Sequence, residues 1–401
     1  MRLPGRKALL IAGALAGAVV LFLAIRGGRD AGPPGSSGAE SARDRDSARA
    51  GATAAGAARK PFQDVAVQVQ AHERERARTG PGGESMELLE QRLERYQSNL
   101  DRYRESTKYP PTSRPIAEQP DQLEPHNVPP RRLPLVGPDG KTSDKALVIL
   151  RQDYYFLAGN ETVTFTVECA TANGPVPCEI MESMAMSPGG AKHAEVLFAM
   201  DTGGLFHEAR FQPATEGFAD HHGPIHVEVE LRIAGEAGTA SFDLEYTARP
   251  PAVVTGRVSE KLVKGSLVLG LELQIEKPGR YVIAGRVDDV TGRSFAYVAF
   301  NEELPRGRAE AELVVFGKLV LDEKARSPFR LRDVEGFLLK ENADPDRELL
   351  PTRAGVVHTT REYRDQDFSA DEWQSEERQR HLDEFERDVE RARKELEEAK
   401  R

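Results

Sequence analysis

Several short segments of this chain alternate strictly between apolar and polar residues, and this pattern constrains its fold most. Residues 161–168, 225–233 and 239–246 each place an apolar side chain at every second position. Successive side chains of a strand point to opposite faces, so alternation predicts strands with one buried and one wetted face. Such strands are typical of antiparallel sheets. Separated by Gly and Pro turns, they predict a first β-sandwich over residues 146–248.

A second set of strand patterns follows the hinge Arg249-Pro250-Pro251. Two of these segments flank Asp288–Gly292, which has the composition of a hairpin turn. The strand segments are residues 266–275, 279–287, 293–300, 312–317 and 329–339. The predicted fold class is therefore mainly β, with two consecutive antiparallel β-sandwich (Ig-like) units.

Two helices are expected outside these units. The first has large side chains spaced alternately by three and four, which forms a heptad seam: Met86, Leu89, Leu93, Tyr96, Leu100 and Tyr103. A free helix of about 20 residues is marginal in water. The seam should therefore be buried, either in a self-associating coiled coil or against the β body, and we favour docking on the β body.

The second helix is charged and is expected to begin at a capping box, Ser369–Glu372, and to run close to Arg401. It carries a thin apolar stripe of Leu382, Phe385, Val389, Ala392 and Leu396. Two interpretations stay open. The helix is either packed weakly on the body, or it is an arm for self-association or for a partner.

Residues 8–25 form an apolar run without a charge, long enough to cross a bilayer. They predict a single transmembrane helix, so the lipid bilayer is the first expected partner. The alternative is a cleaved signal peptide. We favour an uncleaved anchor because the run is long and Arg26 follows it directly. The N-terminus is expected in the cytoplasm, with the bulk of the chain periplasmic or extracellular.

Cys169 and Cys178 are the only cysteines. They flank a segment of turn-forming residues between two strand-like runs, so a hairpin would bring them within reach of a disulfide. Two buried thiols are the alternative. An oxidising compartment favours the disulfide.

No sequence motif for catalysis or for a cofactor is present. Gly140-Lys141-Thr142 resembles the end of a phosphate-binding loop, but Leu135 occupies the position of its first glycine. The net charge is -10 and no basic patch is interleaved with aromatic residues, which argues against nucleic-acid binding. We therefore predict no catalytic residues, no cofactor and no enzyme activity.

Two groups of residues could bind a metal ion by type alone. His221, His222 and His226 lie near Glu228 and Glu230, but the last three share the expected wet face of one strand. The aspartates at 288, 289, 344 and 346 fall in turns, where Asp is common, without calcium-loop spacing. The prediction is that neither group is a metal site.

Three stretches carry a family resemblance: residues 109–116, residues 279–287 with Asp333–Phe337, and Phe368–Trp373. They resemble bacterial surface proteins of the choice-of-anchor X domain type, found in myxobacteria and relatives. The resemblance covers about residues 109–373 and implies a β architecture and an exported location. It implies no reaction.

These features give an expected order of parts. It is a transmembrane anchor (1–29), a disordered tether (30–83), an amphipathic helix (84–108), a Pro-rich extended strap (109–145), two β-sandwich domains (146–248 and 249–360) and a charged C-terminal helix (361–401). We expect a non-enzymatic cell-envelope protein that binds or scaffolds an unknown envelope protein or glycan. The alternatives are a metal-dependent hydrolase using residues 221–230, and a periplasmic assembly factor or chaperone.

Overall fold

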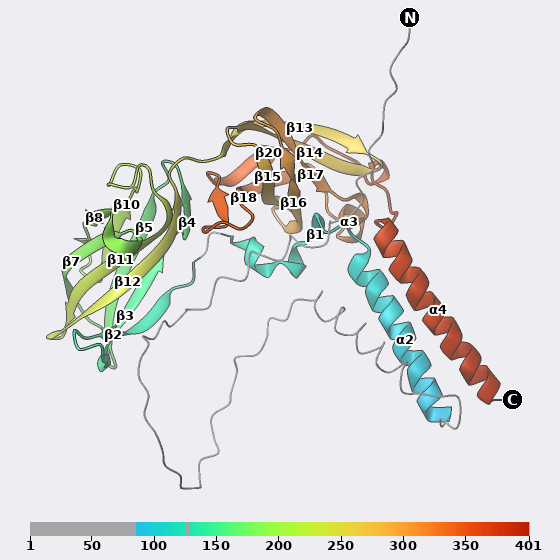
Figure 1. Cartoon of the computed structure of the whole chain (residues 1–401), viewed down its shortest axis with the longest axis horizontal. Coiled ribbons are helices and arrows are strands. Elements are labelled where there is room, and N and C mark those ends of the chain that lie inside the picture. Colours follow the sequence, from blue (N-terminus) through green and yellow to red (C-terminus); the bar gives the residue numbers. More distant parts are fainter. Residues whose placement is uncertain (1–85, 126–127, 401) are drawn as a thin grey trace, which may run out of the picture. The chain divides into compact units, whose positions relative to one another are not determined.

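The computed structural model describes residues 86–125 and 128–400 (Figure 1). The chain divides into two compact units, Met1–Gln97 with Asp388–Arg401, and Ser98–Arg387. The predicted anchor at 8–25 and tether at 30–83 lie outside the described residues and stay predictions. Within the described ranges, no helix is long and apolar enough to span a membrane.

The protein is mainly β, as predicted, and its pairing is almost wholly antiparallel. The first β domain is one sheet that runs β8-β7-β11-β12-β2-β3-β5-β10-β9, with β4 on β12 and β6 on β5. Its strands are β2 (Arg131–Val136), β3 (Thr142–Gln152), β4 (Phe156–Ala158), β5 (Val163–Thr171), β6 (Gly174–Pro175), β7 (Cys178–Met186), β8 (His193–Glu195), β9 (Ala199–Met200), β10 (Phe206–Phe211), β11 (His222–Ile233) and β12 (Glu236–Thr247).

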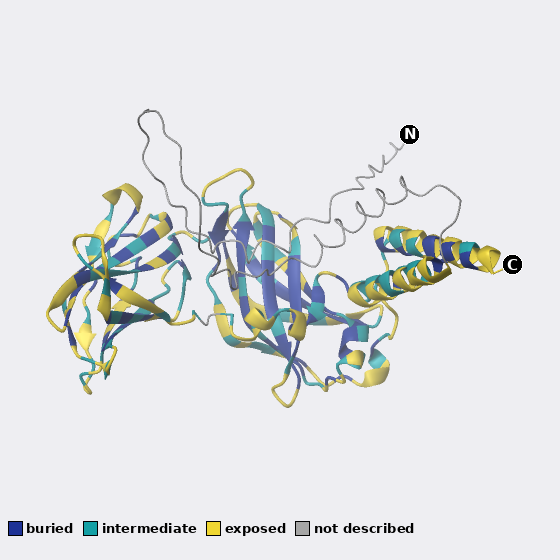
Figure 2. Ribbon diagram, turned by 90° about the horizontal axis from the view of Figure 1, so that it is seen from below, coloured by how far each residue is buried: buried dark blue, intermediate teal, exposed yellow. Residues whose placement is uncertain are grey.

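The alternation seen in the sequence corresponds to the two faces of this sheet (Figure 2). In β11, Ile225, Val227 and Val229 are fully buried, while the intervening side chains are partly or wholly exposed. The inward side chains of β5 and β12 join them in one apolar core around Phe165 and Phe242. Burying one face this way supplies the main stabilisation of the domain.

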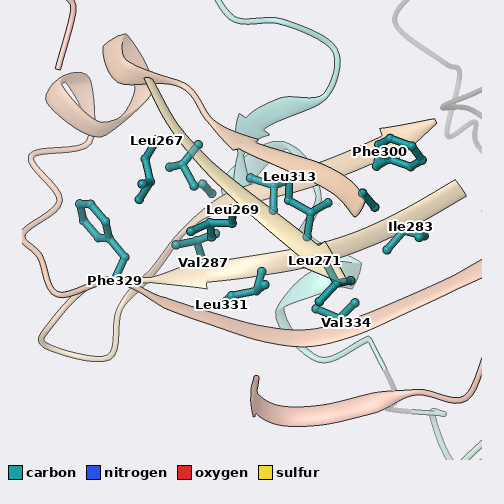
Figure 3. Packing of buried hydrophobic residues seen from close by; sticks show 14 of the residues in the cluster. Leu267, Leu269, Leu271, Ile283, Val287, Phe300, Leu313, Phe329, Leu331 and Val334 are labelled. Carbon is teal, nitrogen blue, oxygen red and sulfur yellow. The ribbon is translucent and has the colours of Figure 1, made fainter. Parts of the chain in front are cut away.

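The second β domain has two sheets, β1-β16-β15-β18-β19 with β20 on β18, and β13-β14-β17. Its strands are β1 (Ser113–Pro115), β13 (Ala252–Val263), β14 (Ser266–Ile275), β15 (Gly279–Asp288), β16 (Ser294–Leu304), β17 (Gly307–Val315), β18 (Arg330–Leu339), β19 (Arg347–Leu349) and β20 (Arg353–Thr359). A short helix, α3 (Gly317–Asp322), follows β17. Figure 3 shows the core, to which Leu271 of β14, Val287 of β15 and Phe329, directly before β18, contribute.

The expected strap over residues 109–145 is shorter than predicted. Its first part forms β1 and two single 3-10 turns, η2 (Ile116–Glu118) and η3 (Pro120–Leu123). Residues from Arg131 onward already belong to β2 and β3 of the first β domain. Pro134 is tolerated in β2 because this part of the strand pairs on one side only.

The heptad seam is buried in part, at Leu89 and Leu100, while Met86 is exposed, and it faces the C-terminal helix rather than a β-sandwich. In the first unit, Arg92 of α2 (Met86–Thr107) pairs with Glu395 of α4 (Glu376–Ala399) at 3.0 Å. In the second unit, the Tyr103 ring lies 5.2 Å from the Phe385 ring. The stripe predicted for the charged helix is the face that is buried in this antiparallel pair.

The helix also begins later than its predicted capping box. Residues 369–372 are not helical, and Ser375 is the capping residue, since its hydroxyl accepts the Arg378 N–H at 3.0 Å. Ser369 serves another purpose. Its backbone N–H donates to the Gly265 carbonyl at 2.9 Å and fixes the segment against the second β domain.

Candidate functional site

The histidines considered as metal ligands make separate contacts in the structure. His221 contacts its own turn, with Nε2 3.0 Å from the Pro224 carbonyl. On β11, Nδ1 of His226 lies 2.8 Å from Asp243 Oδ1 of β12. No group of three or more His, Cys, Asp or Glu among the described residues could hold a metal ion.

The predicted wet face of β11 continues across its neighbours. Outward residues stand opposite one another in rows, with Met186 beside His226, Met184 beside Glu228, and Glu182 beside Glu230. At the outer edge, β8 adds Glu195 beside Met184. We call this surface the acidic–methionine face, and it consists of Glu182, Met184, Met186, Glu195, His226, Glu228 and Glu230.

The carboxylates of this face have no compensating partner. Glu182, Glu195, Glu228 and Glu230 make no ion pair or side-chain hydrogen bond within the described part of the chain. Glu182 and Glu230 stand directly opposite each other. Like charges placed opposite each other on a sheet destabilise it. This arrangement therefore contributes nothing favourable to the fold of the isolated protein.

Exposed carboxylates on one sheet of the second β domain do have cross-strand partners. On the sheet β13-β14-β17, the Glu312 carboxylate accepts from Lys261 Nζ at 2.6 Å. Glu272 accepts from the Thr255 hydroxyl at 2.7 Å and lies 3.6 Å from Arg308. The first β domain also pairs carboxylates across strands elsewhere, as Glu179 of β7 does with Arg232 of β11 at 3.2 Å. The unpaired carboxylates are therefore a property of the acidic–methionine face and not of the whole domain.

Methionine is concentrated on the same domain. The chain has six methionines, and Met181, Met184, Met186 and Met200 lie in β7 and β9. Thioether side chains are flexible and polarisable and are over-used at surfaces that bind varied partners. Unpaired carboxylates together with methionine therefore mark this face as the candidate site.

Part of this site could be predicted from the sequence. The wet face of 225–233 was predicted, with His226, Glu228 and Glu230 on it. The contribution of residues 181–195 was missed, because no pattern in a single strand shows which neighbour it pairs with or in what register. The spacing of Met184 and Met186 by two, as on one face of a strand, was the available clue.

The two cysteines form a disulfide next to this site. Cys169 in β5 and Cys178 in β7 are bonded with their Cα atoms 6.0 Å apart. We predict that the variant Cys169→Ala/Cys178→Ala loses about 2–3 kcal/mol of stability, because the bond closes a short loop in the unfolded chain. Thermal unfolding of wild type with and without reductant provides the comparison. Alkylation of both cysteines in unfolded, unreduced protein would contradict the bond.

The aspartates considered for calcium serve their own turns and neighbouring arginines. Asp289 accepts from the backbone N–H of Thr291 at 2.8 Å. Asp288 is nearly fully buried and pairs with Arg332 at 3.2 Å. Asp346 pairs with Arg347 at 2.8 Å. These contacts account for the first two aspartates and for Asp346 without a metal ion.

A titratable carboxylate lies close to this ion-pair cluster. Burial raises the pKa of Glu335 on β18 to about 7, and the carboxylates of Asp121 and Asp333 push it the same way. The folded state therefore holds a proton that the unfolded chain releases near pH 4.5, so stability falls as pH rises from that value through 7. Glu335→Gln should raise the melting temperature at pH 8 and leave it unchanged at pH 5. Equal shifts at both pH values would contradict this.

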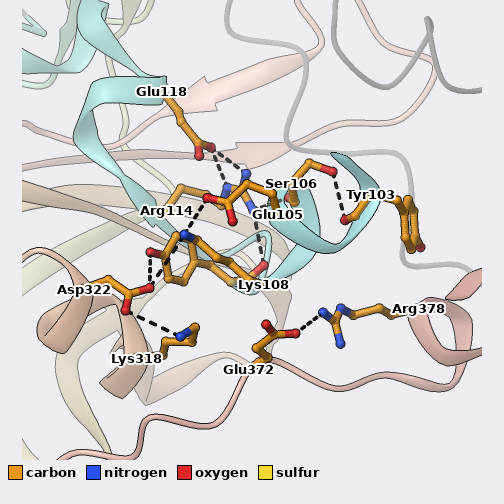
Figure 4. A network of polar contacts seen from close by, with 11 residues as sticks. Tyr103, Glu105, Ser106, Lys108, Arg114, Glu118, Lys318, Asp322, Glu372 and Arg378 are labelled. Carbon is orange, nitrogen blue, oxygen red and sulfur yellow. Dashed lines mark hydrogen bonds and ion pairs between the residues drawn. The ribbon is translucent and has the colours of Figure 1, made fainter. Parts of the chain in front are cut away.

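A polar network fixes the base of the helical pair to the second β domain (Figure 4). The Tyr109 hydroxyl donates to Asp322 of α3 at 2.7 Å, and Lys108 lies 3.7 Å from the same carboxylate. Arg378 of α4 is almost fully buried and donates to the Thr107 hydroxyl at 3.0 Å. Burial raises the pKa of Tyr109, so this phenol stays a donor at physiological pH.

One pocket of about 620 Å³ opens in the second β domain beside residues 361–367. Its charged lining is balanced, with Arg361 and Arg364 against Glu362 and Asp367. Arg361 is stacked on the Tyr363 ring, 4.9 Å from its centre, and Arg364 lies 3.7 Å from Asp367. With both signs of charge present, the pocket does not favour one class of ligand.

Comparisons with known proteins show limited similarity. No known family and no curated protein matches the sequence. A solved DUF4785 family protein from Legionella pneumophila is similar over 54% of this chain and 56% of its own, with 10% identity and a TM-score of 0.37. A DUF4426 family protein from Pseudomonas aeruginosa shares 16% identity over 26% of this chain and 93% of its own, with a TM-score of 0.20. Escherichia coli alpha-2-macroglobulin shares 11% over 52% of this chain and 16% of its own, with a TM-score of 0.21.

Proposed function

We propose that this chain is a non-enzymatic binding or scaffolding protein of the cell envelope. In this proposal, residues 8–25 hold it at a membrane and the Ig-like first β domain contacts the partner through the acidic–methionine face. The observation that carries the proposal is the unpaired, like-charged row formed by Glu182 and Glu230 on an exposed sheet face.

The physical argument is one of cost and compensation. Carboxylates held opposite each other repel, and a partner with positive charge would relieve that repulsion on binding. The favourable free energy of these contacts in the complex then exceeds the unfavourable repulsion in the free protein. Residues that oppose stability in the free fold are commonly kept for function. The paired carboxylates of the second β domain show that this chain does place partners beside acidic side chains elsewhere.

The rest of the chain supports a scaffolding role. The polar network through Tyr109, Asp322 and Arg378 joins two helices to the second β domain. A tether that enters through α2 would thus be attached to a folded body at several points. Such a construction holds the first β domain near a membrane while leaving its sheet face open for a partner.

A pull-down from native envelope tests the proposal. The bait is the full chain, as wild type, as Glu182→Gln/Glu230→Gln, and as the matched control Glu302→Gln/Glu303→Gln. The control removes two exposed carboxylates from β16 of the second β domain. Wild type and control should retain the same envelope component, and the face variant should lose it. Equal retention by all three would refute the proposed surface.

A further inference from the structure

An exposed apolar surface borders the acidic–methionine face. Its four side chains belong to β7, to β9 and to the loops beside them, and they are unusually open to solvent: Met181 50%, Leu197 74%, Met200 51% and Leu205 66% exposed. We call these four residues the apolar edge. Single exposed apolar residues are ordinary, but neighbouring large ones that form a patch mark an interaction surface.

Hydrogen bonds and strand pairing relate the segments that carry these residues. The Val196 N–H donates to the Ser183 carbonyl at 3.0 Å, which places Leu197 beside the part of β7 that carries Met181. Met200 pairs with His207 across β9 and β10. His207 Nε2 lies 2.9 Å from the Cys178 carbonyl and so connects β10 to the start of β7. These contacts place the segments that carry Met181, Leu197 and Met200 near one another, and the Leu205 N–H donates to Asp201, next to Met200, at 2.7 Å.

Acidic residues surround this apolar edge. Glu182 adjoins Met181, and Glu195 lies two residues before Leu197 and pairs with Met184. Glu182 and Glu195 have no ion pair or side-chain hydrogen bond in the part of the chain that the structure describes. The surface thus combines an apolar centre with an acidic rim.

We infer that the partner is a polypeptide segment in which apolar side chains are flanked by lysine or arginine. This inference rests on the proposed function and names the chemistry of its partner. The apolar side chains would cover the apolar edge, and the cations would lie over Glu182, Glu195 and Glu230. Complementary charges around an apolar centre are the usual arrangement of a specific protein interface.

Two other occupants fit the surface less well. The inner leaflet and other anionic lipid surfaces carry negative charge, which the acidic rim would repel. A second copy related by two-fold symmetry would place the same carboxylates against themselves. Neither occupant neutralises Glu182 and Glu230, whereas a basic segment does.

Recognition through side chains rather than by strand addition fits the edge of this sheet. The outer strand β8 has three residues. The loop at Gly217 also approaches it, since a Cβ placed there would lie 3.4 Å from the His193 carbonyl oxygen. A short edge strand with a loop close to it offers little free backbone for another strand.

Defined peptides test the inference. The probes are capped seven-residue peptides that alternate lysine with leucine, lysine with serine, or glutamate with leucine, and binding to the full chain is followed by fluorescence anisotropy in physiological salt. Wild type should bind the lysine–leucine peptide at least about fivefold more tightly than the other two, since both charge and apolar contact contribute.

Matched variants locate the binding. Glu182→Gln/Glu230→Gln and Leu197→Ser/Met200→Ser should each weaken lysine–leucine binding about fivefold, which corresponds to about 1 kcal/mol. Glu302→Gln/Glu303→Gln and Val263→Ser/Val356→Ser change the second β domain in the same way and should leave it unaltered. Equal binding of the lysine–serine peptide, or equal losses in the control variants, would overturn the inference.

The other occupants are measured in parallel. Co-sedimentation with vesicles of phosphatidylserine and phosphatidylcholine that is lost in Leu197→Ser/Met200→Ser would show that a membrane, and not a polypeptide, binds this surface. If sedimentation velocity shows a dimer for wild type and a monomer for this variant, the surface binds a second copy of the chain and not a polypeptide segment. If the envelope pull-down depends on Glu182 and Glu230 while no peptide binds, the proposed function stands and this inference fails.

Discussion

Gly317→Ala is expected to destabilise the second β domain, although alanine is the better helix former at the start of α3. Helix propensity alone would favour alanine by about 1 kcal/mol. A Cβ at this position, however, would lie 2.0 Å from the Gly265 carbonyl oxygen and 2.9 Å from the Ser369 backbone nitrogen. Both are backbone atoms held by hydrogen bonds, so neither can move cheaply. The expected loss is about 3 kcal/mol.

Gly137→Ala is the control for this prediction. Its added Cβ would approach a flexible side chain, Asp139 Oδ1 at 3.1 Å, at an exposed turn. The melting temperature should fall clearly for Gly317→Ala and stay near wild type for Gly137→Ala. Greater stability in Gly317→Ala would show that Ser369 does not lie against Gly265 and Gly317 as described.

Leu271→Ala should cost about 2–5 kcal/mol of stability, the range measured for fully buried leucines. Leu271 is inaccessible to solvent at the centre of β14, where it packs with residues of both sheets. Truncation leaves a cavity that the rigid strands on either side, β13 and β17, cannot fill. Chemical denaturation of the variant provides the measurement.

Val263→Ala is the matched control, because Val263 belongs to the neighbouring strand β13 and is 43% exposed. Its loss should stay within about 0.5 kcal/mol, as for most surface substitutions. Similar losses in the two variants would mean that the side chains facing between the two sheets do not form the core.

The strands were the most predictable part of the fold. Alternation over 161–168 and 225–233 reports which side chains are buried, and β5 and β11 follow it residue by residue. The heptad seam likewise indicated a buried helix face. It could not indicate the covering element, because a seam specifies an apolar stripe and not its partner. The partner, α4, lies about three hundred positions further along the chain, since Arg92 and Glu395 are 303 residues apart.

The predicted start of the charged helix was wrong, because the sequence contains two serines close together that could each cap it. Ser369–Glu372 has the composition of a capping box, but Ser375 caps the helix. The contacts of Ser369 with Gly265 and Gly317 determine the outcome, and these are long-range. Only part of the candidate site could be predicted, because the rest depends on long-range contacts. Glu228 and Glu230 could be placed on a wet face, but the opposition of Glu182 and Glu230 depends on the pairing of two distant strands.

Methionine oxidation tests most directly whether the first β domain provides the binding surface. The full chain is exposed briefly to hydrogen peroxide, alone and bound to its envelope partner, and the sulfoxide at each methionine is measured by mass spectrometry. The account predicts slower oxidation of Met181, Met184, Met186 and Met200 in the complex. Met86 on α2 is 37% exposed and serves as the internal control, with an unchanged rate. Protection of Met86 alone, or of no methionine, would contradict the account.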